Sequence, residues 1–326
     1  MSSVKIRKQC MILVAMALLL WGQGRLFAAP VVSVSTLPLH SLVSLVMKGV
    51  GEPTLLMASG QSPHHQSLLP STIRKIAESD LVVWVGPVHE SSLSRAVQQV
   101  ENEAIIMTLI DNPQITRLPS RRGGIWDEGS HSHESDDSEN HSEGGHGSLS
   151  VDGHIWLSTD NAKSIIEVVG KQLKEMDVEN KAAYKRNMDL AYQRIDRLKR
   201  DLKDQFAHVR KKDYLVFHDA YQYLEAEFDL RPAGVVAISP DRAPSAKTLR
   251  NLRQLIEKIN DDNQSVCIFR EPQFKSSAIT ILDENNNVIT SELDPIGIGI
   301  ERGSDLWFKL MYDLGAALAS CLATKH

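Results

Sequence analysis

A long amphipathic stretch in the middle of the chain constrains the fold more than any other feature. Between Asp177 and about Lys211, apolar residues recur at steps of three and four, with charged residues between them. The apolar positions are Tyr184, Met188, Ala191, Ile195, Leu198, Leu202, Phe206 and Val209. The spacing predicts one helix roughly 50 Å long, at a rise of 1.5 Å per residue. A dimeric coiled-coil arm shares this pattern, but the apolar positions are not purely Leu and Ile. We therefore expect a single rigid helix that joins two lobes and limits their movement.

The residues before this helix alternate between apolar runs and helical patterns. Leu81–Val85 is a continuous apolar run closed by Gly86 and Pro87, which is typical of a parallel strand covered on both faces. The other expected strands are Val31–Thr36, Thr54–Ser59 and Ala104–Ile110, and the expected helices are Ser41–Lys48, Pro70–Ala77 and Ser158–Met176. Alternating strands and helices predict an α/β lobe with a parallel sheet.

The residues after the long helix repeat this alternation. The expected strands are Tyr214–Phe217, Gly234–Ser239, Val266–Phe269, Ile279–Leu282 and Val288–Leu293, and the expected helices are Pro244–Ile259 and Ser304–Leu322. The predicted fold class is therefore α/β, with two lobes, each a parallel sheet flanked by helices, joined by the long helix.

The N-terminus has the pattern of a secretory signal. Positive residues precede the apolar run Cys10–Trp21, and the small residues Ala28 and Ala29 follow it. The run is too short to anchor the chain across a bilayer. The predicted organisation is a signal peptide (1–29), an N-terminal α/β lobe (30–176), a linking helix (177–211) and a C-terminal α/β lobe (212–326).

Charge and cysteine content narrow the possible partners. Residues 1–29 contain four basic and no acidic residues, so their removal takes the formal net charge from −5 to −9. An acidic surface argues against nucleic acid as a partner and suits a carrier of cations. Two cysteines then remain, Cys267 and Cys321. In an oxidising compartment they most simply form a disulfide, and two buried unpaired thiols are the alternative.

A polar tract lies within the N-terminal half. Residues 127–146 contain four histidines and seven acidic residues and almost no apolar ones. Such a composition cannot bury enough surface to offset chain entropy, so we expect a mobile loop at about residues 127–147. Histidine-rich and acidic tracts are also typical of metal binding.

Three histidines share one predicted position in the fold. His64 follows the second strand, His154 follows the polar tract, and His218 ends the first strand of the C-terminal half. Ligands of open parallel sheets bind beyond the carboxyl ends of the strands. Together with Asp294, these side chains would form a four-coordinate site for Zn²⁺ in the cleft between the lobes.

Each of these residues has a simpler interpretation. His64 and its neighbour His65 lie in a polar loop where a surface histidine is ordinary, and His154 lies among apolar residues where a core histidine is ordinary. His218 precedes an aspartate that could orient it or cap a helix, and Asp294 precedes a proline, as turn residues often do. Surface or helix-end positions are expected for His40, His89, His208 and His326.

Six motifs resemble those of one family in order along the whole mature chain. They are GQSPHHQSLLPS, ESDLVVWVGP, DGHIWLS, YLVFHDAYQYLE, IFREPQF and LDPIG. The chain resembles the ZnuA-like high-affinity zinc-uptake proteins, which are solute-binding receptors of ABC transporters. The resemblance implies a metal held in the interlobe cleft by His64, His154 and His218. It also implies the acidic ligand Asp294, the histidine- and acid-rich loop at 127–147, and a Cys267–Cys321 disulfide.

One departure from the family pattern affects the fourth ligand. Some zinc-specific members carry an acidic residue just before the first histidine, and Pro63 occupies that position here. Asp294, His65 or a water molecule would then complete the site. The resemblance favours zinc over manganese because manganese-binding members tend to have a carboxylate at the position of His218, and imidazole suits zinc.

The expected function is that of a periplasmic receptor, not an enzyme. We expect it to capture Zn²⁺ as a monomer and to deliver the ion to the membrane permease of a zinc ABC importer, without a nucleic-acid partner. Three histidines also form the shell of a catalytic zinc, so a secreted zinc hydrolase is one alternative. It would need an open coordination position and a general base, and the chain has no HExxH motif. Two further alternatives are a receptor for manganese or another divalent metal, and an adhesin or metal buffer without a transporter.

Overall fold

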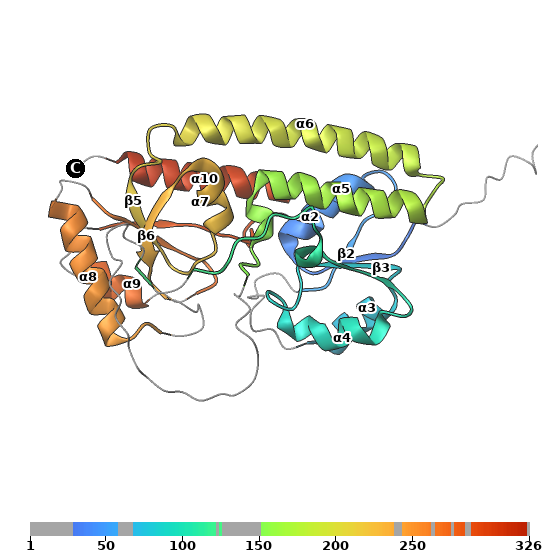
Figure 1. The fold of residues 1–326 in the computed structure, drawn as a ribbon, viewed down its shortest axis with the longest axis horizontal. Helices are drawn as coiled ribbons and strands as arrows, with labels where there is room; N and C mark the ends of the chain where they lie inside the picture. The colour runs from blue at the N-terminus through green and yellow to red at the C-terminus, as the bar shows by residue number, and fades with distance from the viewer. Residues whose placement is uncertain are drawn as a thin grey trace, which may run out of the picture.

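The chain forms two parallel four-stranded sheets (Figure 1). The computed structural model describes residues 29–57, 68–121, 124–125, 151–237, 243–261, 265–274, 277–283 and 288–324. The first sheet has the order β2-β1-β3-β4, with β1 at Val32–Val34, β2 at Thr54–Leu55, β3 at Leu81–Trp84 and β4 at Ile105–Thr108. The second has the order β6-β5-β7-β8, with β5 at Asp213–Val216, β6 at Arg231–Val235, β7 at Cys267–Arg270 and β8 at Ile289–Glu292. The strand pairs within both sheets are parallel, which confirms the predicted fold class.

Helices cover both faces of each sheet. On the first sheet, α3 (Pro70–Ala77) and α4 (Ser94–Val100) pack on one face, and α2 (Leu37–Met47) and α5 (Thr159–Met176) pack on the other. On the second, α8 (Ala246–Asp261) and α9 (Ser277–Asp283) pack on one face, and α7 (Gln222–Phe228) and α10 (Leu306–Ala323) pack on the other. Short 3₁₀ helices occupy Ser91–Leu93 (η1), Leu109–Asp111 (η2) and Ile155–Leu157 (η3). The double covering explains why strands such as β3 are wholly apolar.

The long helix α6 (Lys181–Phe206) runs along both sheets in Figure 1. It packs against α5 and α2 beside the first sheet and against α10 beside the second. Its 26 residues give a length of about 39 Å, shorter than expected from the sequence. The difference arises at both ends. Asp177 accepts hydrogen bonds from Asn180 and Tyr184 and thereby forms the turn between α5 and α6, and residues 207–211 form a turn instead of continuing the helix.

One apolar core extends across both sheets. A single cluster contains Val34 of the first sheet, Val216 of the second, and buried residues of α2, α5, α6 and α10. Tryptophan side chains add hydrogen bonds across this core. Trp156 Nε1 donates to the carbonyl oxygen of Pro295 at 2.9 Å, and Trp307 Nε1 donates to the carbonyl oxygen of Trp156 at 2.8 Å. The two halves are therefore joined by a packed interface as well as by α6.

The Cys267–Cys321 disulfide joins β7 to α10, with the two Cα atoms 6.1 Å apart. This confirms the pairing that the resemblance implied. Within the described part of the chain, α10 is also the one helix long and apolar enough to cross a membrane by length and composition. Its buried face carries Trp307, Met311 and Leu314, so here it serves as a core helix.

The structure corrects three expectations. Ile279–Leu282 lies within the helix α9, where Ala278, Ile279 and Leu282 are buried at helical spacing, and is not a strand. His40 and His89 are buried instead of lying at the surface. His40 Nε2 lies 2.9 Å from the carbonyl oxygen of Pro53, so a hydrogen bond compensates for its burial.

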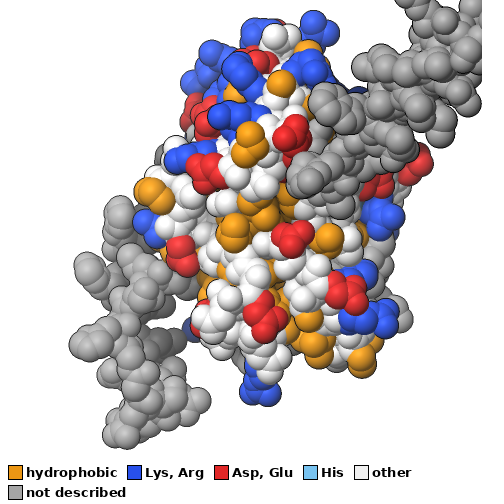
Figure 2. All heavy atoms as spheres, turned by 90° about the vertical axis from the view of Figure 1, so that its right-hand side faces the viewer, with side chains coloured by type: hydrophobic (Ala, Val, Ile, Leu, Met, Phe, Trp, Pro, Cys, Tyr) orange, Lys and Arg blue, Asp and Glu red, His pale blue; other side chains and the backbone are white. Residues whose placement is uncertain are grey.

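Positive charge is concentrated on α6. This helix carries eight basic and four acidic residues, although the whole chain has a net charge of −5. Figure 2 shows the end of the molecule at which α5 turns into α6, with Lys and Arg side chains gathered over its upper part. Hydrophobic side chains are scattered over its lower part. The face that carries α6 therefore differs in charge from the chain as a whole.

Candidate metal centre

His154 is held in place by the aspartate two residues before it. Asp152 Oδ1 accepts the backbone N–H of His154 at 2.9 Å and lies 2.7 Å from the ring Nδ1. His154 then precedes η3, and its side chain is almost wholly buried. Because a carboxylate only accepts hydrogen bonds, Nδ1 carries the proton and Nε2 is the nitrogen left to bind a metal.

His218 is held in the same way by a residue distant in sequence. It follows β5, and Glu271 follows the neighbouring strand β7, so both lie at the carboxyl edge of the second sheet. The Oε1 atom of Glu271 lies 2.5 Å from Nδ1 of His218, and Gln273 donates to Oε2 of Glu271 at 2.9 Å. Sequence reasoning missed Glu271, because its contact with His218 exists only after the strands pair.

The two imidazoles lie together between the sheets. Their ring centres are 5.3 Å apart, with His154 coming from the first half of the chain and His218 from the second. Each ring has its Nδ1 bound to a carboxylate, which is the arrangement that orients metal-binding histidines in proteins. The structure therefore brings together two of the four residues expected to bind the metal.

His89 and Trp156 pack around the ring of His154. The ring of His89 lies 5.0 Å from each of the other two rings, edge to face. Gly153 makes this packing possible, because a Cβ atom there would lie 2.7 Å from Cβ of His89. His89 follows β3, and no local pattern in the sequence indicates that it reaches His154.

Asp294 follows β8 and makes hydrogen bonds within its own loop. Its Oδ1 accepts the backbone N–H groups of Ile296 and Gly297 at 3.1 and 2.9 Å, and its Oδ2 accepts that of Ile298 at 2.6 Å. Asp294 therefore acts as a turn residue, which was the simpler interpretation of its place before a proline. A carboxylate has about four lone-pair positions, so these bonds leave capacity for a metal.

Nearby carboxylates alter the protonation of His154. Burial lowers the pKa of His154, but the charge and hydrogen bond of Asp152 and the charges of Glu271 and Asp219 outweigh it, so the pKa is raised above its ordinary value. Burial also raises the pKa of Asp219 to about 7, although the nearby Arg121 lowers it. Several acidic side chains thus surround the imidazoles, and their negative charges favour the binding of a cation.

The remaining ligand positions fall outside the described residues. His64 and His65 lie in residues 58–67, and the polar tract lies in residues 126–150, and neither range is described. Within the described ranges no group of three or more His, Cys, Asp or Glu side chains forms a metal site.

This architecture, with two parallel sheets and carboxylate-held imidazoles between them, is that of a two-lobed solute-binding receptor of the metal-binding kind. Residues 32–321 match the family described as zinc-uptake complex component A, periplasmic (ZnuA). The chain belongs to this family.

Relatives cover almost the whole chain. The high-affinity zinc uptake system protein ZnuA of Yersinia pestis is 32% identical over 317 residues, which cover 97% of each chain. The protein of the same description from Brucella suis biovar 1 is 32% identical over 313 residues, covering 90% of this chain and 91% of the relative.

Solved structures share the fold. A crystal structure of a ZnuA protein matches with a TM-score of 0.72 and 19% identity, covering 90% of this chain and 100% of that one. The periplasmic zinc-binding protein TroA of Treponema pallidum matches with a TM-score of 0.72 and 15% identity, over 90% and 99% of the two chains. FpvC of Pseudomonas aeruginosa, in complex with Mn²⁺, matches with a TM-score of 0.72 and 19% identity, over 90% and 98%. At these identities the likeness concerns the fold alone.

Proposed function

We propose that the protein is a periplasmic receptor that captures Zn²⁺ and delivers it to the permease of a zinc ABC importer. The observation that carries the proposal is the pair His154 and His218, 5.3 Å apart, each held at Nδ1 by a carboxylate. Membership of the ZnuA family and the zinc-uptake relatives from Yersinia and Brucella support the same conclusion.

The proposed ligands are His64, His154, His218 and Asp294, with His65 or a water molecule as alternatives for the fourth position. Imidazole donors suit Zn²⁺, whereas Mn²⁺ favours oxygen donors. The carboxylate partners Asp152 and Glu271 increase the basicity of the two described imidazoles and fix their tautomer. In this proposal the metal would also link the two halves of the chain.

The family consists of solute-binding receptors, so the protein is a receptor and not an enzyme. The metal ion is therefore cargo, and the site must bind it and later release it without a chemical reaction. The proposed organisation is a signal peptide at residues 1–29, a lobe at 30–176, a linking helix at 177–211 and a second lobe at 212–326, acting as a monomer.

The proposal is tested by calorimetric zinc titration of the metal-free mature protein. We expect one tight site in the wild type, loss of that site in His154→Ala, and no displacement of zinc by equimolar manganese. His208→Ala is the matched control, because His208 is an exposed histidine in the turn after α6. Tight zinc binding that survives in His154→Ala would place the metal elsewhere and make His154 a core residue.

A further inference from the structure

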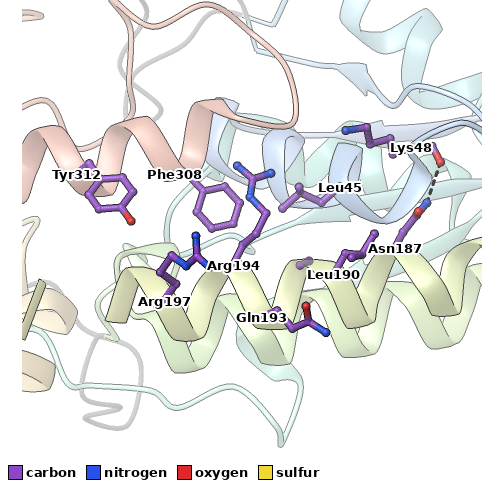
Figure 3. A pocket seen from close by; sticks show the side chains of 10 residues that line it. Leu45, Lys48, Asn187, Leu190, Gln193, Arg194, Arg197, Phe308 and Tyr312 are labelled. Atoms are coloured by element: carbon purple, nitrogen blue, oxygen red, sulfur yellow. Dashed lines mark hydrogen bonds between the residues drawn. The ribbon is translucent and has the colours of Figure 1, made fainter. Parts of the chain in front are cut away.

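A groove lies on the face of the molecule where α2, α6 and α10 meet (Figure 3). It has a volume of about 430 Å³, within the range of small-molecule sites in proteins. None of the residues around the two imidazoles lines it, so it is separate from the metal centre. Residues from both halves of the chain form it, with Leu45 on α2 and Phe308 on α10.

Three cationic side chains line this groove. Figure 3 shows Arg194 and Arg197 rising from α6 towards α10, and the nitrogen of Lys48 directed towards the groove from the end of α2. Arg194 is fixed in place, because its Nη2 donates to Oδ1 of Asp305 at 2.7 Å and its guanidinium carbon lies 3.9 Å from the centre of the Phe308 ring. A guanidinium held in this way has further N–H donors for an anion.

Lys48 and Arg197 add further positive charge, part of which acts on Asp305, because Arg194 and, less strongly, Lys48 lower the pKa of that carboxyl. In the described part of the chain, neither Lys48 nor Arg197 lies within ion-pair distance of a carboxylate. Arg197 belongs to α6, which carries a net positive charge, and Lys48 adds one more positive charge from the end of α2. Charge complementarity therefore favours an anion as the occupant.

The rest of the groove is lined by the polar side chains Asn187 and Gln193 and by apolar ones. Leu45 and Phe308 are almost wholly buried beneath it, and Leu190 on α6 is 53% exposed at its edge. An inorganic anion would leave the side chain of Leu190 in contact with water. An organic anion would cover it with its hydrocarbon part while its charged group meets the cations.

We propose that the groove binds a small organic anion, in which a carboxylate or phosphate group is attached to a compact apolar ring or chain. The anionic group lies between Arg194, Arg197 and Lys48, and the apolar part lies against the exposed side chain of Leu190. The site requires neither the metal nor the metal-binding histidines.

The test uses three probes of one shape, 3-phenylpropionate, 3-phenylpropionamide and 3-phenylpropylamine, followed by NMR on the ¹⁵N-labelled zinc-loaded protein. We expect saturable shifts from the carboxylate at the amides of α2, α6 and α10 around the groove. Binding of the amide should be weaker by about tenfold or more, because a charge-assisted hydrogen bond is lost. Equal binding of the amide or amine, or no saturable shift with the carboxylate at millimolar concentration, would overturn the proposal.

A pair of variants at Leu190 provides the matched control. Leu190→Glu places a negative charge at the edge of the groove, where it also reaches Arg194 one turn along the helix, and should abolish binding of 3-phenylpropionate. Leu190→Lys should retain binding, because the methylene groups of the lysine keep the apolar contact and its charge does not repel the anion. Glutamate and lysine form helices about equally well, so the two variants differ mainly in charge. Lys203→Gln, on α6 but outside the groove, should bind as the wild type does. Unchanged binding in Leu190→Glu would contradict the proposal.

Discussion

Oδ1 of Asp152 lies 2.7 Å from Nδ1 of His154 and also accepts the backbone N–H of the same residue. The carbonyl oxygen of Asp152 accepts a hydrogen bond from Tyr223 at 2.8 Å, and the Tyr223 oxygen accepts the N–H of Leu118 at 3.1 Å. The orientation of His154 is thus fixed from both halves of the chain, since Tyr223 lies on α7. In the proposed metal site, these contacts would preorganise His154.

Asp152→Asn should weaken zinc binding about tenfold, because an amide holds the Nδ1–H of His154 less strongly and makes the imidazole a poorer donor. A competition titration with a zinc chelator at pH 7.5 measures this change. Asp160→Asn is the control, because Asp160 is exposed and pairs with Lys199 away from the imidazoles. Equal zinc affinity in all three proteins would show that Asp152 does not act on the ligand.

Zinc affinity should fall as the pH falls, starting above pH 6.5. A histidine binds metal only when neutral, and the carboxylates around His154 raise its pKa despite burial, so protons compete with zinc at a higher pH than for an ordinary histidine. Each competing histidine contributes a loss of about tenfold per pH unit below its pKa. Titrations between pH 8 and 5 test this, and Asp152→Asn should move the onset to lower pH. An affinity constant over this range would contradict histidine ligation.

Deleting residues 127–147 should leave the tight zinc site intact and affect only the rate of capture or weak secondary binding. Both sides of this region are anchored independently of the tract. The N–H of Asp152 donates to the carbonyl oxygen of Leu118 at 2.9 Å, and Pro119 pairs with Val151. Ile125, just before the tract, pairs with Gly234 of β6. A short Gly-Ser link can therefore replace the tract without moving His154. Calorimetry gives the affinity and stopped-flow mixing gives the rate. Loss of the tight site would assign the ligands to the tract.

Glu90 should make the metal-free protein less stable as the pH rises to neutrality. Burial raises its pKa from 4.5 to about 7, although hydrogen bonds from Ser35 and the backbone of Gly86 and Val85 lower it. The folded state holds the proton of Glu90 more tightly than the unfolded state does. This proton therefore stabilises the folded state fully below pH 4.5, and the stabilisation is lost as the pH rises through about 7.

Glu90→Gln removes this titration. The free energy of unfolding of Glu90→Gln minus that of the wild type should therefore be about 3 kcal/mol larger at pH 8 than at pH 4.5. Urea denaturation at both pH values measures the difference, with the exposed Glu101→Gln as the control. If the free energies of unfolding of Glu90→Gln and the wild type differ by the same amount at both pH values, Glu90 is ionised throughout.

Removing the disulfide with the Cys267→Ser and Cys321→Ser double substitution should lower the free energy of unfolding by about 4 kcal/mol, since the bond closes a loop of about 55 residues. Urea denaturation measures the loss. Reductant should destabilise the wild type by a similar amount and leave the double variant unchanged. Zinc affinity should be retained in the variant, because the bond joins β7 to α10 away from the imidazoles.

The parallel sheets could be predicted from the sequence because their strands are continuous apolar runs such as Leu81–Val85, and the covering on both faces that these runs indicate is present. The short run Ile279–Leu282 was misassigned, because three apolar residues and a threonine fit a strand and a buried helix equally well. The length of α6 was overestimated at both ends. Its start depends on hydrogen bonds to the side chain of Asp177, and the apolar spacing continues to Val209, which lies in the turn after the helix.

The candidate site could be predicted only in part. His218 could be identified as a candidate from its place at a strand end, and His154 from its place between the polar tract and a helix. The resemblance implied both as ligands, and the structure brings them together. The carboxylate partner of His154 had a local signal, since Asp152 is two residues away, but that of His218 did not, since Glu271 lies 53 residues away. His89 was assigned to the surface because its burial depends on Trp156, which is distant in the chain.

The hydrogen bond from the Trp307 backbone to Oγ of Ser41, which joins residues 266 positions apart, bears on how the chain folds. Ser41 lies on α2, so this helix completes its packing only after α10 has been synthesised and has packed against it. The N-terminal half therefore cannot complete its core as the chain emerges from the ribosome. Contacts this distant in sequence slow folding, and they make the two halves unfold as a single cooperative unit.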